Sequence, residues 1–142
     1  MNRFIFLIIV LITFSCGEKQ NETKIEVVKE KIIKEFGFTL NNFNVKKDTI
    51  ESGDSFGLIL EKNNLFYPKI YNIVQETKKV FDIRKINVGR PYTILSSKDS
   101  LNQPLVFIYQ PNAVDYLVVS LGDSLWAEKK QKEIKLKEFE AM

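Results

Sequence analysis

The first fifteen residues constrain the fold most, because they take a block of apolar sequence away from any folded domain. Met1-Asn2-Arg3 supplies a positive charge, and an almost wholly apolar run extends from Phe4 to Phe14 before Ser15. A basic start, a short apolar run and a small residue are the features of a secretory signal. A membrane-spanning helix needs about 20 apolar residues, so this run is short for a span. We expect residues 1–15 to be a signal peptide, with a short uncleaved membrane anchor as the alternative.

Cys16 is the only cysteine, so no disulfide can form within the chain. It directly follows the apolar run, and Leu11-Ile12-Thr13-Phe14-Ser15-Cys16 resembles a relaxed lipobox of the Bacteroidetes type, with Thr13 in place of the usual Leu. The resemblance implies lipid attachment at Cys16 and a position in the cell envelope, anchored to a membrane and facing the periplasm. Two or three acyl chains anchor a protein stably, whereas one binds marginally.

Removal of the signal leaves 142 − 15 = 127 residues, which is enough for one hydrophobic core and too few for two domains. The net charge of +3 favours neither nucleic acid nor an acidic partner. Residues 16–35 carry five charges of each sign before Phe36 and are predicted to be a tether. We expect the folded domain over 36–127. Residues 128–142 are predicted to be a charged linker or an edge strand, at the point where the chain breaks off before later domains.

The pattern of apolar residues within the domain predicts a small α+β fold. Alternation indicates a strand near 43–50, and apolar residues at helical spacing indicate helices over 55–63 and from Pro68 to before Asp82. Asp54 or Ser52 is the expected cap of the first helix. A returning strand follows over 92–95, and two β-rich runs predict an antiparallel hairpin. These runs are Leu105–Tyr109 and Val114–Ser120.

The absence of histidine excludes several kinds of active site. With no histidine in the chain, Ser-His-Asp triads, Cys-His pairs and histidine-zinc sites cannot form. Asp48, Glu51 and Asp54 cluster around one turn and could serve a glycosidase in principle. Acidic residues beside the start of a helix more often cap it and keep it soluble. We therefore expect this chain by itself to have no catalytic residue and no bound metal.

Two segments resemble the lysin motif, LysM. The first is Ile50-Glu51-Ser52-Gly53-Asp54-Ser55-Phe56, in which a strand reaches Gly-Asp-Ser before a short helix. The second is Lys85-Ile86-Asn87-Val88-Gly89-Arg90-Pro91-Tyr92, in which a glycine turn leads into the last strand. The resemblance implies a LysM-like strand–helix–helix–strand unit, here extended by the hairpin. It also implies a glycan site whose candidate residues are Gly53, Asp54, Ser55, Asn63 and Asn64.

A longer series of segments resembles the amino-terminal region of Bacteroidetes peptidoglycan metalloendopeptidases, of the lysostaphin-like zinc class. The segments are Gly53-Asp54-Ser55-Phe56, Tyr67-Pro68, Phe81-Asp82-Ile83-Arg84, Val88-Gly89-Arg90-Pro91-Tyr92 and Phe107-Ile108-Tyr109-Gln110-Pro111-Asn112. In that family an His-x-x-x-Asp and an His-x-His segment of a later domain hold the zinc. Neither has a counterpart here, so the resemblance carries over no catalytic or metal-binding residue.

The resemblance implies a non-catalytic region that positions or regulates a zinc peptidase domain acting on peptidoglycan. Zinc is then expected only in that separate domain. One alternative is a stand-alone lipoprotein that binds peptidoglycan without enzymatic activity. Another is a module that inhibits a metallopeptidase. The expected partners are peptidoglycan, the membrane through lipid on Cys16, and a metallopeptidase domain, and no nucleic acid is expected.

Lipid attachment at Cys16 can be tested in cells fed an alkyne fatty acid. The mature protein should carry the label, because Cys16 is the only thiol and directly follows the apolar run. Cys16→Ala should abolish the label, while Ser15→Ala should retain it. Label that persists in Cys16→Ala would contradict the prediction.

Overall fold

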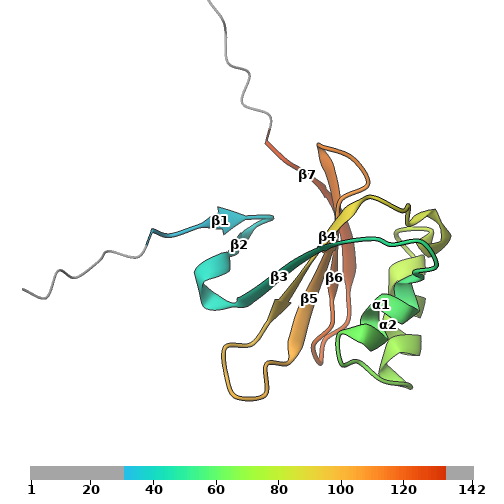
Figure 1. Cartoon of the computed structure of the whole chain (residues 1–142), viewed down its shortest axis with the longest axis horizontal. Helices are drawn as coiled ribbons and strands as arrows, with labels where there is room; N and C mark the ends of the chain where they lie inside the picture. Colours follow the sequence, from blue (N-terminus) through green and yellow to red (C-terminus); the bar gives the residue numbers. More distant parts are fainter. Residues whose placement is uncertain (1–30, 134–142) are drawn as a thin grey trace, which may run out of the picture. The chain divides into compact units, whose positions relative to one another are not determined.

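An antiparallel five-stranded sheet forms the centre of the structure, and two helices lie against one of its faces (Figure 1). The computed structural model describes residues 31–133. The expected signal peptide, Cys16, the tether up to Glu30 and the charged residues 134–142 lie outside the described residues. Within residues 31–133, no helix has both the length and the apolar character that crossing a membrane requires.

The strands and helices follow one another in a simple order along the chain. They are β1 (Lys34–Glu35), β2 (Phe38–Thr39), the 3-10 helix η1 (Leu40–Asn42), β3 (Asn44–Thr49), α1 (Phe56–Lys62), α2 (Lys69–Lys78), the 3-10 helix η2 (Ile83–Lys85), β4 (Pro91–Ser96), β5 (Pro104–Tyr109), β6 (Asp115–Ser120) and β7 (Ala127–Gln131). The sheet order is β3-β4-β5-β6-β7, so each strand pairs with the next strand along the chain.

This order confirms the predicted α+β class, the strand–helix–helix–strand succession and the following hairpin. β3 pairs antiparallel with β4, and β5 pairs antiparallel with β6, where Phe107 lies opposite Val119. Of the two alternatives for the charged segment after residue 127, the structure has an edge strand over β7. The hairpin and the helical unit share one continuous sheet, which the sequence pattern did not predict.

The folded domain includes residues before Phe36, within the segment expected to be a tether, which corrects the expected start of the domain. β1 and β2 pair across a turn in which Phe36 and Gly37 both have positive φ, at 55° and 83°. Two consecutive positive φ values suit the twist of a two-residue hairpin. Phe36 and Leu40 are buried against the sheet. Their burial explains why this short hairpin is held, because two-stranded hairpins alone are marginal in water.

Both faces of the central strands β4, β5 and β6 are buried, and this explains why β5 and β6 read as continuous apolar runs. Phe107 and Tyr109 of β5 belong to the cluster on the helical side of the sheet. Val106 and Ile108, the alternate residues, belong to the cluster beneath the β1–β2 hairpin. The predicted contacts between the helices are confirmed, because one buried cluster unites their apolar residues with two strand partners. Its members include Ile50, Phe56, Ile59, Leu60, Ile70, Ile73 and Ile94, with Val74 packed against them.

The two faces of α2 should respond very differently to substitution. Ile73 is fully buried, so Ile73→Ala should lower the free energy of unfolding by about 2–5 kcal/mol through lost contacts and a cavity. Lys78 is exposed on the same helix, and Lys78→Ala should change the free energy of unfolding by less than about 0.5 kcal/mol. Urea unfolding followed by circular dichroism measures both. Equal midpoints for the two variants would contradict the packing described here.

Candidate functional site

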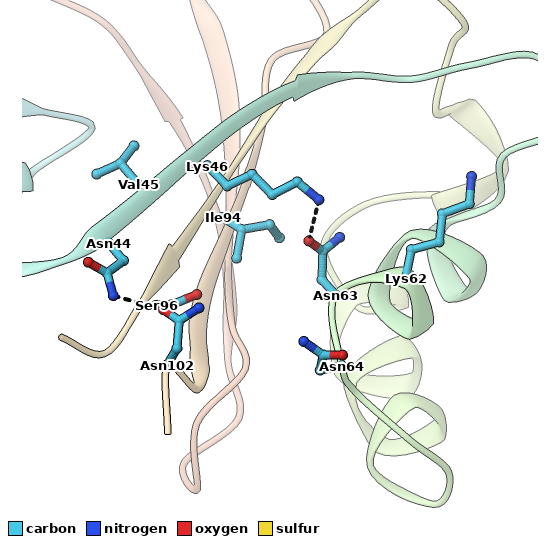
Figure 2. Close-up of a pocket in the computed structure, with 9 residues that line it drawn as sticks. All are labelled: Asn44, Val45, Lys46, Lys62, Asn63, Asn64, Ile94, Ser96 and Asn102. Carbon is cyan, nitrogen blue, oxygen red and sulfur yellow. Dashed lines mark hydrogen bonds between the residues drawn. The ribbon is translucent and has the colours of Figure 1, made fainter. Parts of the chain in front are cut away.

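A polar cavity of about 230 Å³ lies between β3 and the carboxyl end of α1 (Figure 2). We call it the β3–α1 pocket. Its lining residues are Asn44, Val45, Lys46, Lys62, Asn63, Asn64, Ile94, Ser96 and Asn102. Four of them are asparagines and two are lysines, so the pocket is rich in hydrogen-bond donors.

Asn63 is the structural centre of the pocket. It is the C-cap residue of α1 and is buried, and its Nδ2 donates to the carbonyl oxygen of Ile59 at 2.7 Å. The last carbonyls of a helix lack intrahelical donors, and this bond satisfies one of them. Its Oδ1 accepts a hydrogen bond from Lys46 Nζ at 2.9 Å, and Figure 2 shows Lys46 reaching across from β3. Asn63 therefore holds α1 to β3 and has little left to offer a ligand.

Lys46 lies beside a second polar pair on β3 and β4. Tyr92 Oη donates to Asp48 Oδ2 at 3.1 Å, and Lys46 Nζ lies 3.9 Å from the same oxygen. Asp48 and Tyr92 face each other across the two strands. Burial, and then the hydrogen bond and negative charge of Asp48, raise the pKa of Tyr92 to about 12. Tyr92 is thus a neutral donor throughout the physiological range.

The expected turn Gly53-Asp54-Ser55 lies outside the pocket lining, at the amino end of α1. Gly53 has φ +91°, a conformation that favours glycine. The expected helix cap was wrong: Ser55 Oγ, not Asp54 or Ser52, accepts the backbone N–H of Leu58 at 3.3 Å. The Asp54 carboxylate instead accepts the backbone N–H of Glu51 at 2.9 Å and so closes the turn upon itself.

One ion pair links this turn to the pocket. Lys62 Nζ lies 2.7 Å from Asp54 Oδ1, and the Asp54 side chain is only 5% exposed. The hydrogen bond from Lys62, followed by the N–H of Glu51, lowers the pKa of the Asp54 carboxyl, and Asp54 in turn raises the pKa of Lys62. Asp54 therefore orients a lysine that lines the pocket, rather than lining the pocket itself.

Asn64 and Asn102 remain as adaptable polar groups. Both have positive φ, at 64° and 45°, a conformation that asparagine tolerates better than most residues. Asn102 Oδ1 accepts from Asn44 Nδ2 at 2.8 Å, which leaves the Asn102 amino group available. The Asn64 side chain makes no hydrogen bond within residues 31–133. Sequence reasoning missed Asn44, Lys46 and Asn102. For Asn44 and Lys46 a signal existed, because residues 44, 46 and 48 are all polar and share one side of a strand; Asn102 lies outside that strand.

The pocket suits a ligand that presents hydrogen-bond acceptors. Lys46 and Lys62 each make one short bond, and an ammonium group has three donors. With the amides of Asn64 and Asn102, the site can bind amide carbonyls, hydroxyls or a carboxylate. It does not suit zinc: no three Cys, His, Asp or Glu residues lie together within residues 31–133, and the sequence has no histidine.

The comparisons with known proteins give one likeness, and it concerns the fold. No protein-family model and no curated protein matches the sequence. Among solved structures, the chain is similar to a zinc-containing peptidase from Vibrio cholerae, with a TM-score of 0.53 and 15% sequence identity. The similarity covers 61% of this chain and 27% of that chain. At this identity the likeness establishes a fold shared with a part of that peptidase.

The raised pKa of Tyr92 predicts a loss of stability in alkali. An unfolded tyrosine ionises near pH 10 and folded Tyr92 near pH 12, so its contribution is complete below about pH 10 and is lost as the pH rises to about 12. Between about pH 9 and about pH 11, the urea midpoint should therefore fall by more in the wild type than in Tyr92→Phe. In a spectroscopic titration, Asp48→Asn should lower the pKa of Tyr92 while leaving it above the ordinary value, because burial is the larger cause. Identical pH dependence in wild type and Tyr92→Phe would contradict this assignment.

Proposed function

We propose that this chain provides a non-catalytic, peptidoglycan-associated region that positions or regulates a zinc peptidase domain in the cell envelope. The observation that carries the proposal is the likeness of its fold to a part of a zinc-containing peptidase. The likeness agrees with the sequence resemblance of Gly53-Asp54-Ser55-Phe56 and the later segments to the amino-terminal region of such enzymes. Because the similar part covers only 27% of that peptidase chain, cleavage itself is assigned to a separate domain.

We propose further that β3, α1, α2 and β4 form a LysM-like unit. The antiparallel pairing of β3 with β4 and the packing of both helices on one face of the sheet support this interpretation. The β7 edge strand and the β1–β2 hairpin are additions to such a unit. Lipid on Cys16 would keep the region at a membrane facing the periplasm, close to its polymer.

The proposed glycan contact is the β3–α1 pocket rather than the Gly53-Asp54-Ser55 turn. Asn64 and Asn102 present amides that can pair with the hydroxyl and acetamido groups of amino sugars, and Lys46 and Lys62 add donors. Asp54 acts through Lys62, which it orients. Peptidoglycan contains such acceptors in both of its parts: hydroxyl and acetamido groups in its sugars, and amide carbonyls and carboxylates in its stem peptides.

Retention on purified sacculi tests the positioning role. The full-length protein in mild detergent should sediment with sacculi, and Asn64→Gly should weaken retention by about tenfold, because glycine keeps the positive φ and removes only the amide. Gln75→Ala, on the exposed side of α2, is the matched control and should bind as the wild type does.

The regulatory role is tested in the same material with an added peptidase. Wild-type protein should change the rate at which a lysostaphin-class zinc peptidase releases muropeptides from sacculi. Retention without any effect on the rate would favour the stand-alone peptidoglycan-binding lipoprotein. If the protein is not retained on sacculi and also leaves the rate unchanged, the proposed function is refuted.

A further inference from the structure

β3 forms one edge of the sheet and has a single paired neighbour, β4, among residues 31–133 (Figure 1). In an antiparallel pair, alternate residues direct their backbone groups toward the partner and away from it. The backbone N–H of Ile50 donates to the carbonyl of Arg90 at 2.9 Å, which continues the β3–β4 register. The backbone N–H and C=O groups of residues 44, 46 and 48 therefore point toward β4. Those of residues 45, 47 and 49 point toward the open edge.

The pairing of β4 with β5 supports this assignment independently. The N–H of Gln110 donates to the carbonyl of Pro91, so the odd-numbered residues of β4 face β5 and its even-numbered residues face β3. At the open edge, the N–H of Thr49 is already accepted by Asp48 Oδ1 at 2.8 Å. The N–H and C=O groups of Val45 and Lys47 have no partner within residues 31–133.

A cavity lies on each side of this short edge. On the helical side is the β3–α1 pocket, into which Lys46 points while Val45 points away (Figure 2). The other cavity, of about 290 Å³, we call the hairpin pocket. It is lined by Ile33, Glu35, Leu40, Asn41, Val45 and Lys47. Val45 lines both cavities, so they flank the same unpaired backbone groups.

The two cavities differ in chemistry. The β3–α1 pocket presents ammonium and amide donors, whereas the hairpin pocket presents the aliphatic groups of Ile33, Leu40 and Val45 beside one ion pair. Side chains of a strand point alternately to opposite sides. A strand added to β3 would therefore send every second side chain toward the donors and the others toward the aliphatic groups.

We propose that the open edge of β3 binds an extended peptide whose side chains alternate between carboxylates and aliphatic groups. Main-chain hydrogen bonds to Val45 and Lys47 supply attachment, and the two cavities supply selectivity, as in other strand-addition complexes. This inference rests on the edge geometry and is independent of the proposed function.

Charge favours an acidic strand over a second copy of this chain as the occupant of the edge. Lysines on an edge strand discourage pairing with an identical edge. A two-fold pairing centred on Lys46 or Lys47 would bring lysines directly opposite each other, which is destabilising. The Lys46 side chain is 53% exposed and lines the β3–α1 pocket, so it can meet a carboxylate on that side. Lys47, on the hairpin side, is already paired with Glu35 at 2.8 Å. The small net charge gives no general attraction for acidic partners, so this preference is local to β3.

The test uses the full-length protein in mild detergent and a fluorescent, acetylated peptide of alternating Glu and Val. Anisotropy should show saturable binding. Val45→Pro should weaken it at least about tenfold, because proline removes an N–H that faces the open edge and leaves the bonds to β4 intact. Val45→Ala keeps the N–H and should bind within about threefold of the wild type.

Two altered peptides keep the test decisive even if Val45→Pro unfolds. A peptide that is N-methylated at alternate residues cannot complete the ladder and should fail to bind. A peptide with Lys in place of Glu should bind at least about tenfold more weakly. The inference is overturned if the parent peptide gives no saturable binding or if the N-methylated peptide binds equally well. It is also overturned if sedimentation shows a dimer that Val45→Pro dissociates and the peptide does not, because a second copy would then occupy the edge.

Discussion

The position of the helical layer depends on Phe107, at the centre of the sheet. Its ring is fully buried, meets Phe56 of α1 edge-on at 5.2 Å and stacks with Tyr92 of β4 at 5.6 Å between ring centres. Aromatic pairs of this kind add to the free energy of simple burial and also restrict geometry. Through this contact β5 sets how α1 approaches β3. The pocket between those two elements exists because that approach leaves room for the Lys46–Asn63 bond.

Polar groups around the pocket serve the fold first and a ligand second. Asn63 caps the end of α1 and accepts a hydrogen bond from Lys46. Asp54 accepts the backbone N–H of Glu51 within its turn and forms an ion pair with Lys62. Each bond satisfies a group that would be costly to leave unpaired near the core. The remaining donors of Lys46 and Lys62 are consequently held in place before any ligand arrives, which lowers the ordering cost of binding, whereas the Asn64 amide has to be ordered by the ligand.

The fold likeness concerns the architecture of one part of a larger protein. The similarity to a zinc-containing peptidase covers a minor part of that protein, and this chain has no histidine with which to hold zinc. Near β3, residues 31–133 present two surfaces: the polar β3–α1 pocket and the unpaired backbone of the edge itself.

The sequence by itself determined most of the elements and their order, but not the β1–β2 hairpin, because local periodicity reports which side of each longer strand or helix is apolar. It predicted α1, α2, β4 and the β5–β6 hairpin, and two of its five candidate site residues, Asn63 and Asn64, line the β3–α1 pocket. Only the tertiary structure decided that the hairpin completes the same sheet, because strand pairing is a non-local choice. Tertiary structure likewise brought Lys46 to Asn63 and made β3 an edge, since residues distant in sequence meet only when the shared core is packed.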